Sequence, residues 1–176
     1  MTPGFIDLAA LRGARVPPGA GWTPFGAAEE LDAMPPSHRD QLLFLDAPST
    51  AAAYDAVRRR DVLCGDDGWG NSPFSGGCWR TVERTRVDAA DGGGLKKWLH
   101  RRGLPYADPA LLLPVFGPAD EPAVLTTWKM VVKYAATLFC RDNLVAVGAK
   151  AEWCLYYHHD DVLTFARDPD FAKVKG

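Results

Sequence analysis

The amino-acid sequence predicts a single α+β domain, in which a mainly antiparallel sheet packs against helices. The length of 176 residues is typical of one domain. Hydrophobic residues make up 47% of the chain and charged residues 24%, which is average for soluble globular proteins and argues against disorder or a coiled coil. The last third of the chain combines several strand-length apolar segments with one helical pattern, and this combination favours the α+β class.

Proline and glycine are frequent in the first part of the chain, which shows no regular hydrophobic pattern. We therefore expect residues 1–25 to form an N-terminal arm that lies on the core, and residues 26–176 to form the domain. A first helix is predicted within 26–33, where two prolines end it. A second helix is predicted over 38–46, with Ser37 as its cap.

A longer helix is predicted over 50–60, with Ser49 as its N-cap. Ala51, Tyr54 and Val57 recur at three-residue steps, which places them on one side of a helix. Three arginines at the end of this segment suit the negative C-terminal end of the helix dipole.

The segment 64–79 contains five glycines, so neither a helix nor a strand can persist through it. Long loops in compact domains often carry function, and this loop is the first of two candidate sites. Its candidate binding residues are Asp66, Asp67, Trp69 and Asn71. The segment lacks the lysine of a phosphate-binding loop and the distal glutamate of a calcium loop, so a surface loop without a ligand stays an alternative.

The remaining elements follow from periodicity. A strand over 80–87 places three arginines on one side, which we expect to face water. Three glycines are expected to break the chain at 92–94, and an amphipathic helix is predicted over 95–102. Further β-rich strands are predicted in the C-terminal part, together with one helix packed on the sheet; these strands are 110–116, 144–149, 153–159 and 162–167, and the helix is 127–139.

The second candidate site is the cluster His158, His159, Asp160 and Asp161, because histidines and carboxylates serve both metal binding and acid–base catalysis. Adjacent strand residues point to opposite faces, so the two histidines are not expected to face inward together. This spacing argues against a simple metal clip. The two aspartates fall where a two-residue hairpin turn is expected, which explains them without catalysis.

Composition argues against several other classes. The formal net charge of −2 and the pI near 6.1 leave no basic footprint for nucleic acid or an anionic membrane. The apolar runs are too short to span a bilayer and the N-terminus lacks an export signal, so a cytoplasmic protein is expected.

The four cysteines lack metal-binding spacing and are expected to be reduced. No cofactor, metal or catalytic motif is predicted, and an enzyme is the less favoured interpretation.

The order of the C-terminal segments carries a resemblance. The helix WKMVVKYAATLF is followed by the strand NLVAVGA and then by EWCLYYHHDDVLTFAR. A tryptophan before one strand, a histidine–acid turn and an aromatic in the next strand resemble the ending of several small bacterial cytosolic proteins, among them immunity proteins of polymorphic toxin systems. The resemblance covers about 127–167. It implies a single α+β domain that binds and blocks a cognate toxin, with no catalytic residues to carry over.

The first hypothesis is accordingly a protein-binding inhibitor that presents the loop 64–79 and the hairpin tip 158–161 to a protein partner. Six tryptophans support this interpretation, since tryptophan is frequent at interface hot spots. Most of them must be in the core. Trp22 and Trp69 are the ones expected to be exposed, because glycine and proline surround them.

Two alternatives remain open. The chain could be a small hydrolase or transferase, with His158 or His159 as general base and Asp66 or Asp67 nearby. It could also sequester a small molecule in an aromatic cavity. An enzyme requires a concave cavity in which a histidine and a carboxylate converge, whereas an inhibitor needs only an exposed patch.

Overall fold

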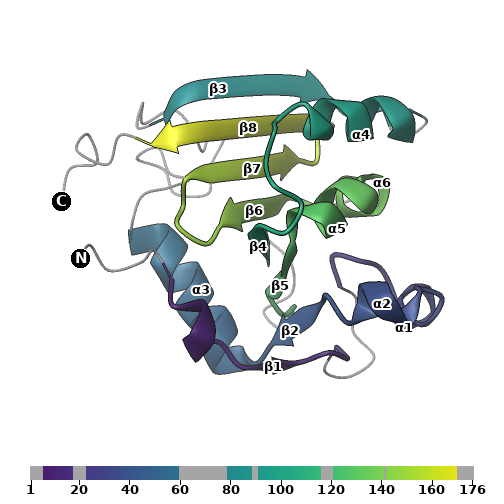
Figure 1. The fold of residues 1–176 in the computed structure, drawn as a ribbon, viewed down its shortest axis with the longest axis vertical. Helices are drawn as coiled ribbons and strands as arrows, with labels where there is room; N and C mark the ends of the chain where they lie inside the picture. Colours follow the sequence, from purple (N-terminus) through teal and green to yellow (C-terminus); the bar gives the residue numbers. More distant parts are fainter. Residues whose placement is uncertain are drawn as a thin grey trace.

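The computed structural model describes residues 6–17, 23–59, 79–88, 91–115, 121–140 and 142–169. This part of the chain is built on one sheet of eight strands in the order β1-β2-β5-β4-β6-β7-β8-β3 (Figure 1). All neighbouring strands are antiparallel, which confirms the predicted α+β class. The strands are β1 (Gly13–Ala14), β2 (Leu43–Leu45), β3 (Trp79–Arg86), β4 (Pro109–Pro114), β5 (Val124–Thr127), β6 (Leu144–Gly148), β7 (Trp153–His158) and β8 (Val162–Pro169).

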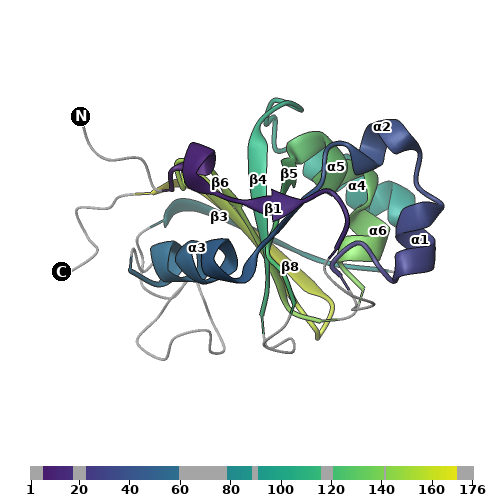
Figure 2. The same ribbon diagram turned by 90° about the horizontal axis from the view of Figure 1, so that it is seen from below.

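Helices cover both faces of the sheet (Figure 2). The long helix α3 lies on one face, and the helices α1, α2, α4, α5 and α6 lie on the other. Their bounds are η1 (Leu8–Ala10), α1 (Ala28–Asp32), α2 (Pro36–Arg39), α3 (Ala47–Arg59), α4 (Gly92–His100), α5 (Trp128–Lys133) and α6 (Ala135–Leu138), of which η1 is a short 3₁₀ helix.

The central strand β4 shows why the sheet needs cover on both sides. Its residues from 110 onward are buried and apolar, and successive side chains point to opposite faces. Ala110 and Leu112 pack in the core beneath α4, α5 and α6. Leu111 and Leu113 pack in the second core, against Val57 of α3. Two hydrophobic layers therefore hold the sheet, one on each side.

The strands β1 and β3 form the two edges of the sheet. In β3, the side chains of Arg80, Arg84 and Arg86 are exposed, as the sequence predicts. Val82 is 41% exposed and lies between these arginines. Charged side chains on an edge strand oppose pairing with another chain, so the arginines protect this edge.

The structure contradicts the helix predicted over 38–46. The helix α2 ends at Arg39, and Leu43–Leu45 is the strand β2. This short strand pairs with β1 on one side and with β5 on the other, and it buries Phe44 and Leu45 in opposite cores. Sheet pairing and burial on both faces thus override a pattern that is compatible with a helix.

Two other helix starts differ from prediction. The helix α3 begins at Ala47, before the predicted cap Ser49, because the carboxylate of Asp46 accepts the Ser49 backbone N–H at 2.9 Å. The helix α4 begins at Gly92, so the three glycines belong to its first turn and do not break the chain. The carboxylate of Asp91 accepts the Gly94 N–H at 2.8 Å and caps this helix.

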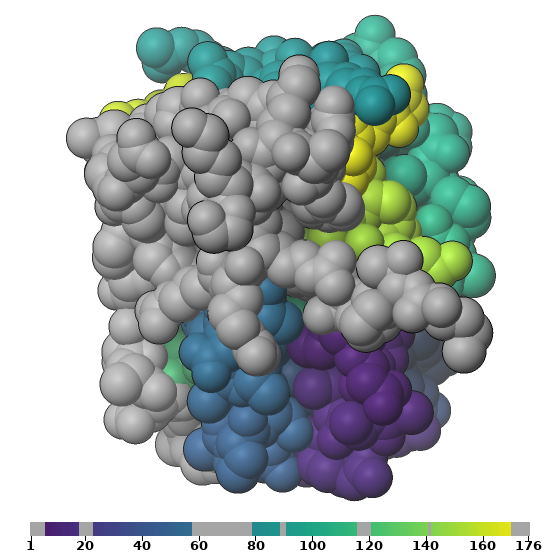
Figure 3. Space-filling view, turned by 90° about the vertical axis from the view of Figure 1, so that its left-hand side faces the viewer, coloured from purple at the N-terminus to yellow at the C-terminus, as the bar shows by residue number. Residues whose placement is uncertain are grey.

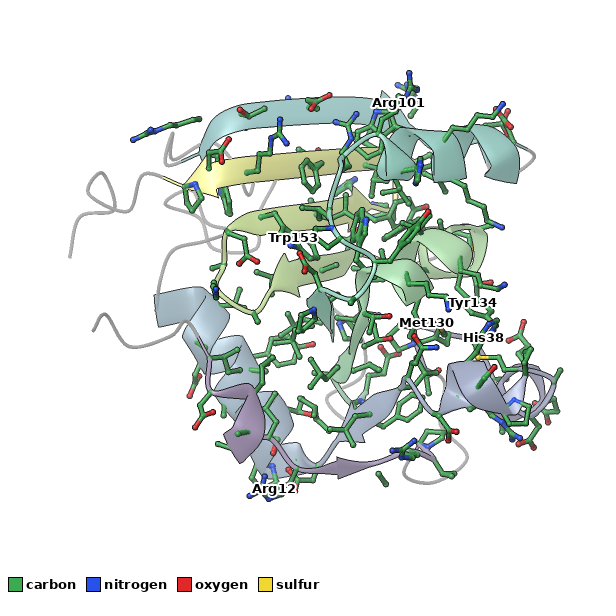
Figure 4. The ribbon with its side chains drawn as sticks, viewed as in Figure 1. Arg12, His38, Arg101, Met130, Tyr134 and Trp153 are labelled. Carbon is green, nitrogen blue, oxygen red and sulfur yellow. The ribbon has the colours of Figure 1, made fainter. Side chains whose placement is uncertain are left out.

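The helix predicted over 127–139 is divided in two at Tyr134, whose backbone leaves the helical region with φ −102° and ψ 20°. The hydroxyl of Tyr134 lies 2.7 Å from Nδ1 of His38, which lies within α2 (Figure 4). The division therefore coincides with a hydrogen bond that joins the α5/α6 region to α2.

The N-terminal segment lies beside α3, as Figure 3 shows for the residues that are coloured purple and blue. The backbone N–H of Arg12 donates to the Ser49 hydroxyl at 2.9 Å, and β1 adds to the edge of the sheet beside β2. The described part of the predicted arm is thus held by α3 and by the sheet.

Candidate functional site

The hairpin between β7 and β8 carries the second predicted site. The last pair of the ladder is His158 with Val162, so the loop has three residues and not the predicted two. Its third residue, Asp161, has a φ of 61°. A three-residue hairpin commonly ends in such a left-handed residue. Aspartate tolerates this conformation, and the Asp161 carboxylate also accepts the Tyr157 hydroxyl at 3.0 Å.

The two histidines lie side by side in this hairpin, with ring centroids 4.2 Å apart. His158 is the last residue of β7 and is only 24% exposed. His159 is the first loop residue and is 60% exposed. The strand alternation that separates neighbouring side chains ends at His158, and this is why the second ring does not go to the opposite face. His158 is the less exposed of the two histidines, and the two rings are in contact.

The carboxylate of Asp160 faces both rings. Its Oδ2 lies 3.3 Å from Nδ1 of His158, and its Oδ1 lies 3.8 Å from Nε2 of His159. One ligand atom from each of the three residues lies within 4.8 Å of the others. The tight loop therefore brings together three metal-ligating groups that the sequence spacing did not predict to converge.

Asn143 anchors this hairpin, and the sequence did not mark it as part of the candidate site. It precedes β6, is only 6% exposed, and its backbone carbonyl accepts the N–H of Val115 after β4. Its side-chain Oδ1 accepts the His159 backbone N–H at 2.7 Å and lies 3.0 Å from the His159 ring Nδ1. No sequence signal marks this residue, because it lies 16 positions from His159 and looks like an ordinary turn asparagine.

A shallow pocket adjoins the hairpin, and Asn143 forms part of its wall together with Glu121, Asp142 and Thr137. Burial, followed by the negative charge of Asp142, raises the pKa of the Glu121 carboxyl. The cavity volume is about 30 Å³, room for a few water molecules at most. A site of this size cannot enclose a substrate of drug-like dimensions, which typically needs several hundred Å³.

A histidine outside the hairpin, His38, forms a polar pair with Tyr134. His38 is hydrogen-bonded to Tyr134, and its ring packs edge-to-face on the tyrosine at a centroid distance of 5.7 Å. Desolvation lowers the pKa of His38, and the nearby cations Lys133 and Lys129 lower it further. Desolvation raises the pKa of the Tyr134 hydroxyl. Both groups are therefore neutral around pH 7.

Several predicted residues cannot be placed in this site. Asp66, Asp67, Trp69 and Asn71 lie outside the described residues, as does Trp22. Among the described tryptophans, Trp128 and Trp153 are core residues, with exposed fractions of 1% and 0% and ring centroids 5.1 Å apart. Figure 4 shows Trp153 at the sheet, beneath the side chains of the helical layer. The presence of these two tryptophans is explained by their burial as large aromatic side chains in the core.

The fold and the hairpin define an α+β protein with an exposed histidine–aspartate tip. Comparison with known proteins finds no matching family model, no similar curated protein and no similar solved structure. Within the described residues, none of the helices has the length and apolar character needed to cross a membrane.

Proposed function

We propose that this chain is a protein-binding inhibitor of the immunity type, which acts in the cytoplasm and neutralises a cognate toxin by binding it through the hairpin tip 158–161. The observation that carries the proposal is the exposure of the tip. The side chains of His159 and Asp160 are 60% and 73% exposed, so they are available to a macromolecular surface. The resemblance of the C-terminal segments to immunity proteins points the same way.

The geometry favours this function over the enzymatic alternative. A general base acts on a substrate that is held in a concave site, and the histidines lie on a projecting turn. The adjoining pocket holds carboxyl groups of Glu121 and Asp142 and little free volume. An aromatic cavity that sequesters a small molecule has no support from this pocket, whose lining contains no aromatic ring.

Charge indicates the chemistry of the partner. Asp160 is exposed at the tip, and Asp142 and Glu121 lie next to Asn143, which holds the tip in place. These carboxylates give the hairpin an acidic neighbourhood. Charge complementarity steers association and disfavours wrong partners, so the surface of the toxin that meets the tip is expected to be basic.

The test begins with the tagged full-length chain, used to isolate a stoichiometric partner from its own cells. Binding of the purified partner is then measured for wild type, for Asp160→Arg and for the matched charge reversal Asp55→Arg on α3. We expect Asp160→Arg to weaken binding by roughly tenfold or more, because reversal of a rim charge places like charges together. Asp55→Arg should bind like wild type.

Neutralisation is the second readout. The partner should be toxic when expressed alone, and co-expression of the wild-type chain should restore growth, whereas Asp160→Arg should restore it less. A partner that both charge reversals leave equally well bound would contradict a role for the tip. A partner with no toxicity would contradict the immunity assignment.

A further inference from the structure

We propose that His158, His159 and Asp160 form a binding site for a divalent transition metal ion, with Zn²⁺ as the ion that best matches the donors. Two imidazoles and one carboxylate make up the protein ligands of many zinc sites that keep an open position. Imidazole nitrogen suits zinc, copper and nickel, whereas magnesium and calcium prefer oxygen donors alone. The proposal goes beyond the inhibitor function, because the chain would bind the ion without a partner.

The distances between the donors fit a single ion. Two ligands of a tetrahedral Zn²⁺ with bonds of about 2.0–2.1 Å stand about 3.3–3.4 Å apart. Nδ1 of His158 and Oδ2 of Asp160 are 3.3 Å apart. Nε2 of His159 and Oδ1 of Asp160 are 3.8 Å apart, and one donor atom from each of the three residues falls within 4.8 Å of the other two. Small side-chain rotations at this exposed tip are enough to close the set around an ion.

Asn143 orients one ligand for metal binding. The backbone N–H of His159 can only donate, so the Asn143 atom 2.7 Å from it is the amide oxygen. The same oxygen lies 3.0 Å from Nδ1 of His159, and this nitrogen must therefore carry the proton. The lone pair is left on Nε2, the atom that faces Asp160. A second partner that fixes the tautomer of a ligand histidine is a common feature of metal sites.

The His158 nitrogen is also prepared to accept a cation. The backbone N–H of Asp160 lies 3.2 Å from Nδ1 of His158 and donates to it, so in the neutral ring this nitrogen holds a lone pair. The Asp160 carboxylate, 3.3 Å away, presents lone pairs and a negative charge to the same nitrogen. A cation between Nδ1 of His158 and the Asp160 carboxylate would bind to both groups. It would replace the 3.2 Å hydrogen bond that the Asp160 backbone N–H donates to His158.

The exposure of the cluster determines what kind of site this is. Because the Asp160 side chain is 73% exposed, the remaining coordination positions of a bound ion would face solvent and be open to water. Three protein ligands and a buried supporting residue, Asn143, describe an open site and not a closed structural one.

The experiment uses the full-length chain after removal of metals with a chelator and dialysis. Titration calorimetry with Zn²⁺ should show saturable binding of one ion per chain. His159→Gln and Asp160→Asn should each weaken it by roughly tenfold or more, since the loss of even a supporting residue usually costs ten- to a hundredfold in metal affinity. His100→Gln removes the last residue of α4, a histidine that is hydrogen-bonded to Tyr106, and this variant should bind Zn²⁺ like wild type.

Substitution with Co²⁺ distinguishes this site from the cysteines. The visible spectrum should report nitrogen and oxygen ligands, without the intense near-ultraviolet band that a thiolate ligand adds. Thermal melting of each variant without metal should match wild type, because the substituted side chains lie at the surface. Absence of saturable binding, a thiolate band, or binding that survives both tip substitutions would overturn the proposal.

Discussion

The guanidinium of Arg102 lies 2.5 Å from the carboxylate of Glu83, and this ion pair joins the turn that follows α4 to the edge strand β3. The Arg102 side chain is only 7% exposed. Its guanidinium carbon lies 4.3 Å from the centre of the Trp98 ring, and its Nε donates to the Trp98 carbonyl at 3.1 Å. The ion pair holds the pKa of the Glu83 carboxyl below its usual range.

The first prediction concerns this pair. Glu83→Gln should lower the free energy of unfolding by about 1–3 kcal/mol, because it leaves a buried charge without its partner. The double variant Glu83→Gln with Arg102→Met should recover part of the loss, since methionine keeps apolar contact with Trp98. Urea denaturation measures both, and Arg84→Gln on the same strand is the control. Equal stability of the single variant and wild type would mean that solvent screens the pair.

Acidification tests the same pair independently. A carboxyl whose pKa is lower in the folded state contributes stability above its unfolded pKa and loses it as the pH falls through the folded value. We therefore expect the difference between wild type and Glu83→Gln to be present at pH 7 and to shrink below about pH 4.5. Melting temperatures measured across this range provide the check.

The second prediction concerns His38. Its pKa is lowered in the folded state, so its contribution to stability is present above the unfolded value of about 6.5 and is lost as the pH falls through the folded value. His38→Gln can still hydrogen-bond to Tyr134 but does not titrate. Between pH 7 and pH 5 the wild type should lose more stability than this variant. A His38→Gln curve parallel to wild type would contradict the lowered pKa of His38.

The third prediction concerns Glu121, whose pKa is raised by burial and by Asp142. A carboxyl with a raised folded pKa supports the folded state when protonated, and this contribution is lost as the pH rises through the folded value. Glu121→Gln should therefore raise the melting temperature at pH 7 and leave it unchanged near pH 4. Asp142→Asn removes part of the same repulsion and should act in the same direction with a smaller effect.

The fourth prediction uses the three glycines at the start of α4. A Cβ at Gly93 would meet only the Asp91 carboxylate at 3.6 Å, whereas a Cβ at Gly94 would overlap that carboxylate. Gly93→Ala should thus stabilise the protein by about 0.5–1 kcal/mol, as expected for alanine replacing glycine in a helix. Gly94→Ala should give no such gain, because it disturbs the cap. Asp91→Ala should cost about 1 kcal/mol. Thermal denaturation of the three variants ranks them.

Much of the fold could be predicted because its strands are unusually apolar. β4 and β6 are continuous buried runs, and no helix pattern competes with them. β2 could not be predicted, because it has only three residues and follows directly on a helical turn. Its strand conformation depends on pairing with β1 and β5, which local sequence does not show. The strand order depends on such tertiary pairings and is not encoded in local periodicity.

The sequence predicts which residues belong to the candidate site but not how they are arranged in space. The sequence identified His158, His159 and Asp160, but their convergence depends on a loop of three residues and on the left-handed Asp161. The loop length shifts His159 out of the strand, and the sequence alone favours a shorter turn. Asn143 reaches the site through the antiparallel pairing of β6 with β7, which places Leu144 opposite Tyr157. A contact of this kind follows from strand register and not from spacing.

The position of β3 has a consequence for how the chain folds. In the part of the sheet that the structure describes, β3 pairs with β8 alone, and even the closest residue pair of this ladder, Arg86 with Val162, is 76 positions apart. During synthesis, β3 leaves the ribosome long before its neighbour exists. Such distant pairing is slow to form. Any nascent chain that stops before β8 leaves β3 exposed as an unpaired strand, and deletion of β8 would detach β3 from the sheet while β7 kept its pairing with β6.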